Sequence, residues 1–296
     1  MGQLQAAQSL GPAELEDIIA STLEETRKRG VDQAEVAVSH DVGLAATVRL
    51  GDVESLEYTN DRGIGITVYC GSRKGSASTS DISGDAIREA VGKACTFASY
   101  TAEDKYAGLA DADRMCADVP DLDLDHPWKL DATAAIELAT TCEASALGYD
   151  KCISNSEGAT VWTNRGVRAY GNTHGFVGSY ARSSHTLSCA VLGTADGDME
   201  RDYYYSSARD PADLDTAESI GVRAATRVLQ RLGARKIKTT RAPVVLIPEL
   251  ARGFIGHAIG AISGGAQYRR SSFLLDAAGE KILSLIHISE PTRPMK

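Results

Sequence analysis

The sequence lacks the features that mark a nucleic-acid-binding or a membrane protein. Its 296 residues include 31 Lys and Arg against 40 Asp and Glu, so the formal charge at pH 7 is −9. An acidic chain has no electrostatic attraction for a phosphate backbone. No apolar run approaches the roughly 20 residues that a membrane-spanning helix needs. Residues 1–18 contain neither the basic nor the apolar region of a secretory signal. We therefore expect a cytoplasmic protein that binds neither nucleic acid nor membranes.

The sequence also has few cysteines and none of the common short catalytic motifs. Its six cysteines include no C-x-x-C pair, which argues against a zinc knuckle or a dithiol redox motif and favours free thiols. No H-E-x-x-H, G-x-S-x-G or G-x-x-x-x-G-K-[ST] string occurs. Without a resemblance to known proteins, the residues predict no activity.

The composition, with 43% hydrophobic and 24% charged residues, is typical of a globular protein, and the length is typical of about two domains. Apolar residues at helical spacing predict a helix over residues 12–29. Four short strand patterns follow within residues 34–79, divided by turn signals at 41–43, 51–52 and 60–63, and a second helix follows Ser83. We predict a first α+β domain over residues 1–106, built as helix, antiparallel meander and helix.

The same order of elements recurs after a linker that we predict for residues 107–130. A helix over residues 131–147 precedes four strand patterns, at 151–163, 165–173, 176–191 and 199–208. Asp210 and Pro211 then have the residue types of a helix start, and this helix is predicted to continue to Gly233. The middle α+β domain, residues 131–238, repeats the architecture of the first domain but not its sequence.

Residues 239–282 are predicted to begin a third domain, with a buried strand at 242–247 and a helix from Pro248 to about Ile262. Residues 283–293, LSLIHISEPTR, resemble the translation of a transposase adapter used to prepare sequencing libraries. We therefore expect residues 283–296 to be an artefact and the C-terminal domain to be truncated after Ile282. Such a fragment would expose apolar faces and aggregate.

Histidines and carboxylates offer two further candidates for chemistry. His174 and His185 fall on adjacent predicted strands, and with Glu157 they could form a self-sufficient hydrolytic site. His257 lies on the predicted helix after residues 242–247, but the residues three and four positions later are Gly260 and Ala261, which have no metal-binding atoms. A lone histidine there predicts no metal site.

Several strings, in their order and spacing, resemble the TldD/PmbA family and specifically its PmbA (TldE) branch. These strings are AEVAVS at 34–39, GITVY and RKGSAS within 65–78, NSEG at 155–158, GNTHG at 171–175, GDMERDY at 197–203 and GGAQYRRSSFLL at 264–275. The resemblance extends over about residues 14–282. It implies a bacterial-type cytoplasmic metallopeptidase made of one TldD-like and one PmbA-like subunit, which acts on unfolded or modified extended peptides in an enclosed chamber.

The resemblance also implies a division of labour between the subunits. TldD-like chains have an H-E-x-x-x-H helix that holds a divalent metal, for which we expect zinc. The matching positions here are Gly256 to Ala261, and both histidines and the glutamate are replaced. The resemblance therefore implies that this chain has no metal ligand and no catalytic residue. As candidate positions in the peptide chamber it indicates Asn155, Glu157, His174 and His257.

One alternative from another class remains open. The same strands and the same missing ligands would suit a stand-alone peptide-binding or regulatory protein without protease activity. A neighbouring reading frame that encodes H-E-x-x-x-H would favour the subunit interpretation, whereas metal in the isolated chain would favour the self-sufficient hydrolase.

Overall fold

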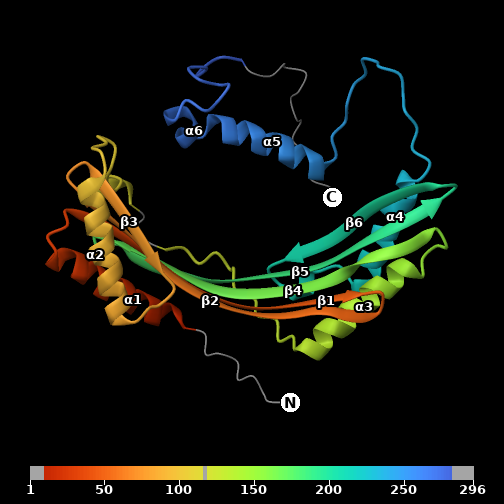
Figure 1. Ribbon diagram of the computed structural model, residues 1–296, viewed down its shortest axis with the longest axis horizontal. Helices are drawn as coiled ribbons and strands as arrows, with labels where there is room; N and C mark the ends of the chain where they lie inside the picture. The colour runs from red at the N-terminus through yellow and green to blue at the C-terminus, as the bar shows by residue number, and fades with distance from the viewer. Residues whose placement is uncertain (1–9, 116–118, 282–296) are drawn as a thin grey trace. The chain divides into compact units, whose positions relative to one another are not determined.

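A single six-stranded antiparallel sheet organises most of the chain, in the strand order β3-β2-β1-β4-β5-β6 (Figure 1). The computed structural model describes residues 10–115 and 119–281. These residues fall into two units, one that ends at Ala234 and one that begins at Arg235. The first unit consists of α1 (Pro12–Lys28), β1 (Gln33–Arg49), β2 (Asp52–Cys70), β3 (Arg73–Thr79), α2 (Gly84–Tyr100), the short 3-10 turn η1 (Ala112–Arg114), α3 (Ala132–Leu147), β4 (Ile153–Asn172), β5 (Val177–Ala195), β6 (Asp198–Ala208), η2 (Pro211–Asp213) and α4 (Ala217–Arg231).

The predicted α+β class and the repeated order of helix, meander and helix are confirmed, but each meander has three long strands instead of four short ones. The predicted turns at residues 41–43 and 60–63, and the predicted break between the strands at 151–163 and 165–173, are wrong, because all three positions lie inside continuous strands. In the sheet, residues 41–43 of β1 pair with 59–61 of β2 on one side and with 164–166 of β4 on the other. The misleading turn signals therefore form one polar band across the sheet, where ladder pairing on both sides of β1 overrides local turn preference.

Two hydrophobic cores lie on the same face of the sheet, one on each side of the polar band. The first core packs Ala34, Val36 and Val38 of β1 against α1 and α2. The second packs Leu44, Ala46 and Val48 of the same strand near α3 and α4. All these positions have the same parity, so they point to one face, which we call the helix face; the opposite side is the open face. Figure 1 shows the sheet bowed, with α1 and α3 on its convex side.

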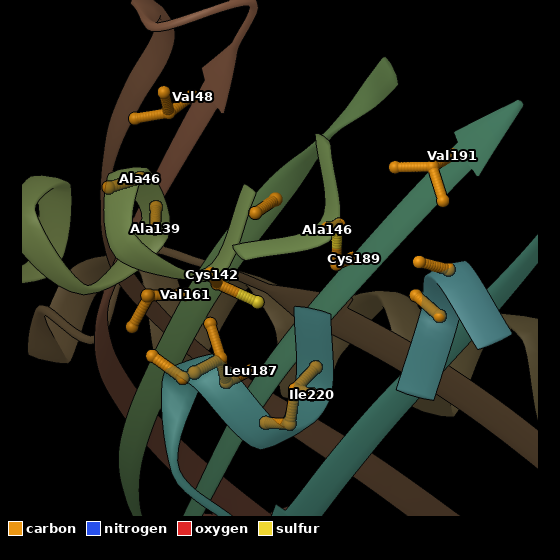
Figure 2. Close-up of a cluster of buried hydrophobic side chains, with 14 of the residues drawn as sticks. Ala46, Val48, Ala139, Cys142, Ala146, Val161, Leu187, Cys189, Val191 and Ile220 are labelled. Carbon is orange, nitrogen blue, oxygen red and sulfur yellow. The ribbon is translucent and has the colours of Figure 1, made fainter. Parts of the chain in front are cut away.

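The second core is built largely from small side chains, which allow the helices to approach closely. Figure 2 shows Ala139, Cys142 and Ala146 of α3 and Ile220 of α4 beside Val161, Leu187, Cys189 and Val191 of the sheet. The hydrogen bond between Cys142 and Cys189, together with burial, raises the pKa of the Cys142 thiol. The expected free thiols are confirmed for the five described cysteines; Cys116 lies outside the described residues.

The segment predicted as a linker packs along the sheet at the polar band. Strand β6 pairs only with residues 185–195 of β5, so residues 177–184 have no strand on their outer side. Here Ser183 N donates to Leu124 O at 2.8 Å, and His126 N donates to Ser183 Oγ at 2.8 Å. Arg165 donates to both carboxylate oxygens of Asp125, with the shortest contact at 2.6 Å. The segment thus covers a free strand edge, and the predicted domain boundaries on either side of it stay a prediction.

Two predicted element boundaries are corrected. Asp210 caps only the turn η2, and the helix that was predicted to begin there starts at Ala217 with Thr216 as its cap. In the second unit, which contains α5 (Pro248–Ile262) and α6 (Gly264–Tyr268), residues 242–247 form no strand, and Val245 is 92% exposed. A strand needs a pairing neighbour, and residues 235–281 supply none.

Residues 283–296, which we expect to be an artefact, lie outside the described residues. Among the described helices, none combines the length and the apolar character required to cross a membrane.

A buried carboxylate fixes the tip of the hairpin between β1 and β2. Glu143 of α3 is only 1% exposed. Its two carboxylate oxygens accept hydrogen bonds from Leu50 N and Gly51 N, each at 2.9 Å. Both hairpin residues have positive φ, 52° and 83°, and for Leu50 this conformation is unfavourable. Glu143 therefore stabilises a strained turn and ties it to α3.

Replacing Glu143 by Ala should lower the free energy of unfolding by about 1–3 kcal/mol, because two amide donors lose a charged acceptor. Urea unfolding would measure this change. Glu137→Ala, on an exposed position of the same helix, is the matched control and should cost less than about 0.5 kcal/mol. Equal stability of the two variants would show that the hairpin tip does not need this acceptor.

The contact between Asp125 and Arg165 should make stability depend on pH. Hydrogen bonds from Arg165 lower the pKa of Asp125, so the contact stabilises the fold above the ordinary carboxyl pKa of about 3.9 and this contribution disappears as the pH falls through the lowered value. Asp125→Asn should therefore cost about 0.5–1 kcal/mol at pH 7, a modest figure because both side chains are partly exposed.

Unfolding measured from pH 7 down to pH 2 should show the difference between the wild-type protein and Asp125→Asn shrinking at the acid end. Asp113→Asn, at an exposed position, is the control and should show no such trend. A difference that stays constant over this range would contradict the assignment.

Candidate functional site

The open face of the sheet carries a groove with a floor of small residues. On β1 the open-face positions near the groove are Ala37, Ser39, Gly43 and Ala45, and Gly63, Gly65 and Gly178 continue this floor on β2 and β5. A cavity of about 970 Å³ lies over it, with Ser39, Arg168, Tyr170 and Tyr180 among its lining residues. Because side chains without bulk leave the backbone accessible, another chain can approach this surface closely.

A cluster of charged side chains lies where the groove crosses the polar band. The Asp41 carboxylate is 2.7 Å from Arg168 Nη2 and 4.0 Å from Arg182 Nη2. Arg168 and Arg182, from β4 and β5, form what we call the arginine pair. Gly166 lies directly opposite Asp41, and a Cβ atom there would be 2.2 Å from Asp41 Oδ1. The cluster therefore requires glycine at this position.

Tyrosines bound to a single carboxylate form one side of the groove. Glu35 accepts hydrogen bonds from Tyr69 OH at 2.8 Å and from Tyr170 OH at 3.0 Å. Burial raises the pKa of both phenols, and the hydrogen bond to Glu35 adds to this effect. The phenols thus stay protonated and hold their donor roles over the physiological pH range. A smaller cavity of about 410 Å³, lined in part by Glu35 and Tyr170, adjoins the first.

The groove has the chemistry of a binding surface. It presents guanidinium groups, phenols and small hydroxyls, which can orient an extended chain by hydrogen bonds and charge. Within residues 10–115 and 119–281, no three or more His, Cys, Asp and Glu side chains gather as a metal site would require.

The candidate chamber residues on β4 do not meet. Asn155 and Glu157 are exposed near the start of the strand, where Glu157 forms an ion pair with Arg201 at 2.6 Å. The hydrogen bond from Arg201 lowers the pKa of Glu157. His174 is exposed in the turn after the strand, and its backbone N–H donates to Asn172 Oδ1 at 3.0 Å. Sixteen residues lie between Glu157 and His174, and those within β4 have a contour length of about 50 Å.

His185, one of the two histidines of the alternative hydrolytic site, uses both ring nitrogens in contacts on the helix face. His185 is buried, and its Nε2 donates to the carbonyl oxygen of His126 at 2.9 Å. Its Nδ1 must then accept from Thr163 Oγ1, at 2.7 Å. Trp128 packs edge-on against the same ring, with centroids 5.5 Å apart. His174, His185 and Glu157 are therefore not brought together in this unit, so the alternative loses its geometric basis.

His257 lies in the second unit, on an exposed face of α5. A helical two-histidine motif needs a second ligand one turn away. The residues one turn before and after His257 are Gly253, Phe254, Gly260 and Ala261, none of which has a ligand atom. The residues of α5 do not fit the metal that the family resemblance implies for TldD-like chains.

Sequence reasoning missed the arginine pair, because Asp41 and Gly166 were interpreted as turn residues. The available signal was the run of small residues at alternate positions 37, 39, 43 and 45. On a half-exposed strand such positions usually carry larger polar or β-branched side chains.

Comparisons with known proteins agree on one family. The PmbA/TldA metallopeptidase domain 1 matches residues 34–98, and the PmbA/TldA metallopeptidase central domain matches residues 125–232. The chain is 45% identical over 269 residues to Metalloprotease PmbA of Escherichia coli O157:H7, and 43% identical over 270 residues to a Metalloprotease PmbA homolog of Haemophilus influenzae. Each alignment covers 91% of this chain and 60% of the relative, so the chain spans about 60% of the length of these curated relatives.

Solved structures agree on the fold. A Bacteroides thetaiotaomicron protein described as a candidate modulator of DNA gyrase superposes with a TM-score of 0.82 at 24% identity, over 89% of this chain and 60% of its own. TldE from Thermococcus kodakarensis superposes with a TM-score of 0.57 at 18% identity, over 73% of this chain and 47% of its own.

The steric requirement at Gly166 gives a direct test of the charged cluster. Gly166→Ala should force the Asp41 carboxylate away from the arginine pair and lower the free energy of unfolding by about 1–2 kcal/mol. Gly65→Ala is the control on the same face, because a Cβ there meets nothing within 4 Å, and it should be neutral or slightly stabilising. Thermal or urea unfolding would compare the two. Equal effects would mean that Asp41 moves without cost.

Proposed function

The chain belongs to the PmbA/TldD metallopeptidase family, and on this premise we propose that it is the PmbA-like (TldE-like), peptide-binding subunit of a heteromeric metallopeptidase. Two observations carry the proposal: the first unit has a long open sheet face, and the residues one turn from His257 on α5 have no metal-binding atoms. The bacterial relatives carry the name metalloprotease, which supports a role in proteolysis.

In this proposal the metal belongs to the partner. A TldD-like subunit would hold a divalent metal, expected to be zinc, which polarises water for peptide hydrolysis. The absence of donor atoms one turn from His257 supports this assignment. The present chain would need no cofactor of its own.

The role of this chain is to bind and orient the peptide. An extended, unfolded or modified peptide lies along the open face, where the small residues near Ser39 allow its backbone to approach. The arginine pair supplies directional donors at the side of the groove, next to Tyr170, whose O–H is already donated to Glu35. Because backbone contacts do not depend on side chains, such a surface accepts many sequences. We place this activity in the cytoplasm of a bacterial cell.

Co-expression with a TldD-like partner tests the proposal. Metal content and cleavage of an unstructured peptide are measured for each chain alone and for the pair; we expect stoichiometric metal in the partner and full cleavage only for the pair. A partner variant with Gln in place of the glutamate of H-E-x-x-x-H should still form the complex but not cleave. If the present chain alone holds stoichiometric metal and cleaves peptide, the proposal is wrong.

The second candidate function is a stand-alone peptide-binding or regulatory protein. The lack of a cluster of metal-ligating side chains among the described residues suits this function equally well. In the same experiment, peptide binding by this chain with no change in the partner's cleavage would support this alternative.

A further inference from the structure

The arginine pair on the open face has binding capacity that the fold itself does not use. Resting on the proposed peptide-binding role, we infer that Arg168 and Arg182 form a subsite that selects acidic side chains, Asp or Glu, within an extended peptide. The inference stands on the distribution of charge, the access to the cavity and the shape of the groove floor.

Charges on this part of the open face are sorted across the strands. Asp41 of β1 and Asp61 of β2 lie side by side, whereas both arginines lie on β4 and β5. Asp41 pairs closely with Arg168, at 2.7 Å, but is 4.0 Å from Arg182. Arg182 has no other hydrogen-bond or ion-pair partner among the described residues, and its side chain is 38% exposed. Most of its five donors are thus available to a ligand.

Arg168 lines the 970 Å³ cavity, and Arg182 lies on the same face of the sheet one strand away. Arg168 and Tyr180 face each other across β4 and β5 and both line the cavity, and Arg182 follows Tyr180 by two residues on the same face of β5. A carboxylate placed over β5 could accept hydrogen bonds from Arg182 while the stem of its side chain packs against the Tyr180 ring. A guanidinium group is well matched to a carboxylate because two parallel N–H groups can bind its two oxygens.

The floor of the groove favours a side-chain carboxylate over a C-terminal one. The small residues continue along β1 in both directions from Asp41, as Ala37 and Ser39 on one side and Gly43 and Ala45 on the other. The floor along β1 is therefore made of small residues on both sides of the arginine pair. This geometry suits an internal acidic residue.

Peptide binding to the chain by itself tests the inference. Three dye-labelled decapeptides of alternating Val and Ser are compared by fluorescence anisotropy at low salt: two are acetylated and amidated with a central Glu or Gln, and the third has a free C-terminal carboxylate and no acidic side chain. We expect the Glu peptide to bind about tenfold more tightly than the Gln peptide, as for one charge-assisted hydrogen-bonded contact. The free-carboxylate peptide should bind like the Gln peptide.

Substitutions test whether Arg182 causes the preference for the Glu peptide over the Gln peptide. Arg182→Gln should abolish it, whereas Arg88→Gln, which removes the same charge from α2 on the helix face, should leave it unchanged. Asp41→Asn should enlarge it, because Arg168 then also becomes available to the peptide; this variant provides a second test if Arg182→Gln does not fold.

Several outcomes would overturn the inference. These are equal binding of the Glu and Gln peptides, a preference that survives in Arg182→Gln, and a free-carboxylate peptide that binds as tightly as the Glu peptide. None of these outcomes contradicts the proposed function, because cleavage by the co-expressed pair is measured separately. Conversely, failure of the pair to cleave would refute the proposed function while the preference of this chain for acidic peptides could still be measured.

Discussion

Strand β1 is hydrogen-bonded along almost its whole length on both sides, to β2 and to β4, and the rest of the fold depends on this pairing. The two helix–meander–helix repeats touch through this strand, because β4 is the first strand of the second repeat. Alternate residues of β1 enter the first core near one end and the second core near the other. One strand thus places two helix pairs on the same side of one sheet.

The polar band interrupts the apolar packing between the two cores, and its polar side chains are stabilised by specific contacts. On the helix face His40 accepts from Leu10 N and donates to Asn60, and the segment around Asp125 and His126 covers the gap beside β5. On the open face the band holds Asp41 and the arginine pair. The site and the interruption in the apolar packing are therefore two sides of the same stretch of sheet.

Local patterns in the sequence predict the α+β class and most of the helices, because apolar periodicity directly reflects which side of a helix is covered. They mispredict the length of the strands, since Asp, Asn and Gly near positions 41, 60 and 164 have the same local preferences in a turn and in the middle of a paired strand. Pairing between β1 and β4 joins residues more than a hundred positions apart, and no local pattern encodes it.

The candidate site shows the same limit. The family resemblance drew attention to Glu157 and His174, which the structure places at opposite ends of β4. The arginine pair could be recognised only once the register placed Arg168 and Arg182 around Asp41. Residues become a site through register, which depends on both neighbours of a strand at once.

The two repeats are continuous segments of chain that meet through backbone pairing between β1 and β4 and through packing of α1 on β4 and α3 on β1. A cut in the segment that joins them would leave two pieces with complementary edges, each containing two helices of its own. Such pieces resemble the halves of a split reporter protein. Each piece alone has one unpaired strand edge, on β1 or on β4, and the two pieces together can restore one sheet. The long shared strand thus makes this fold a natural candidate for fragment complementation.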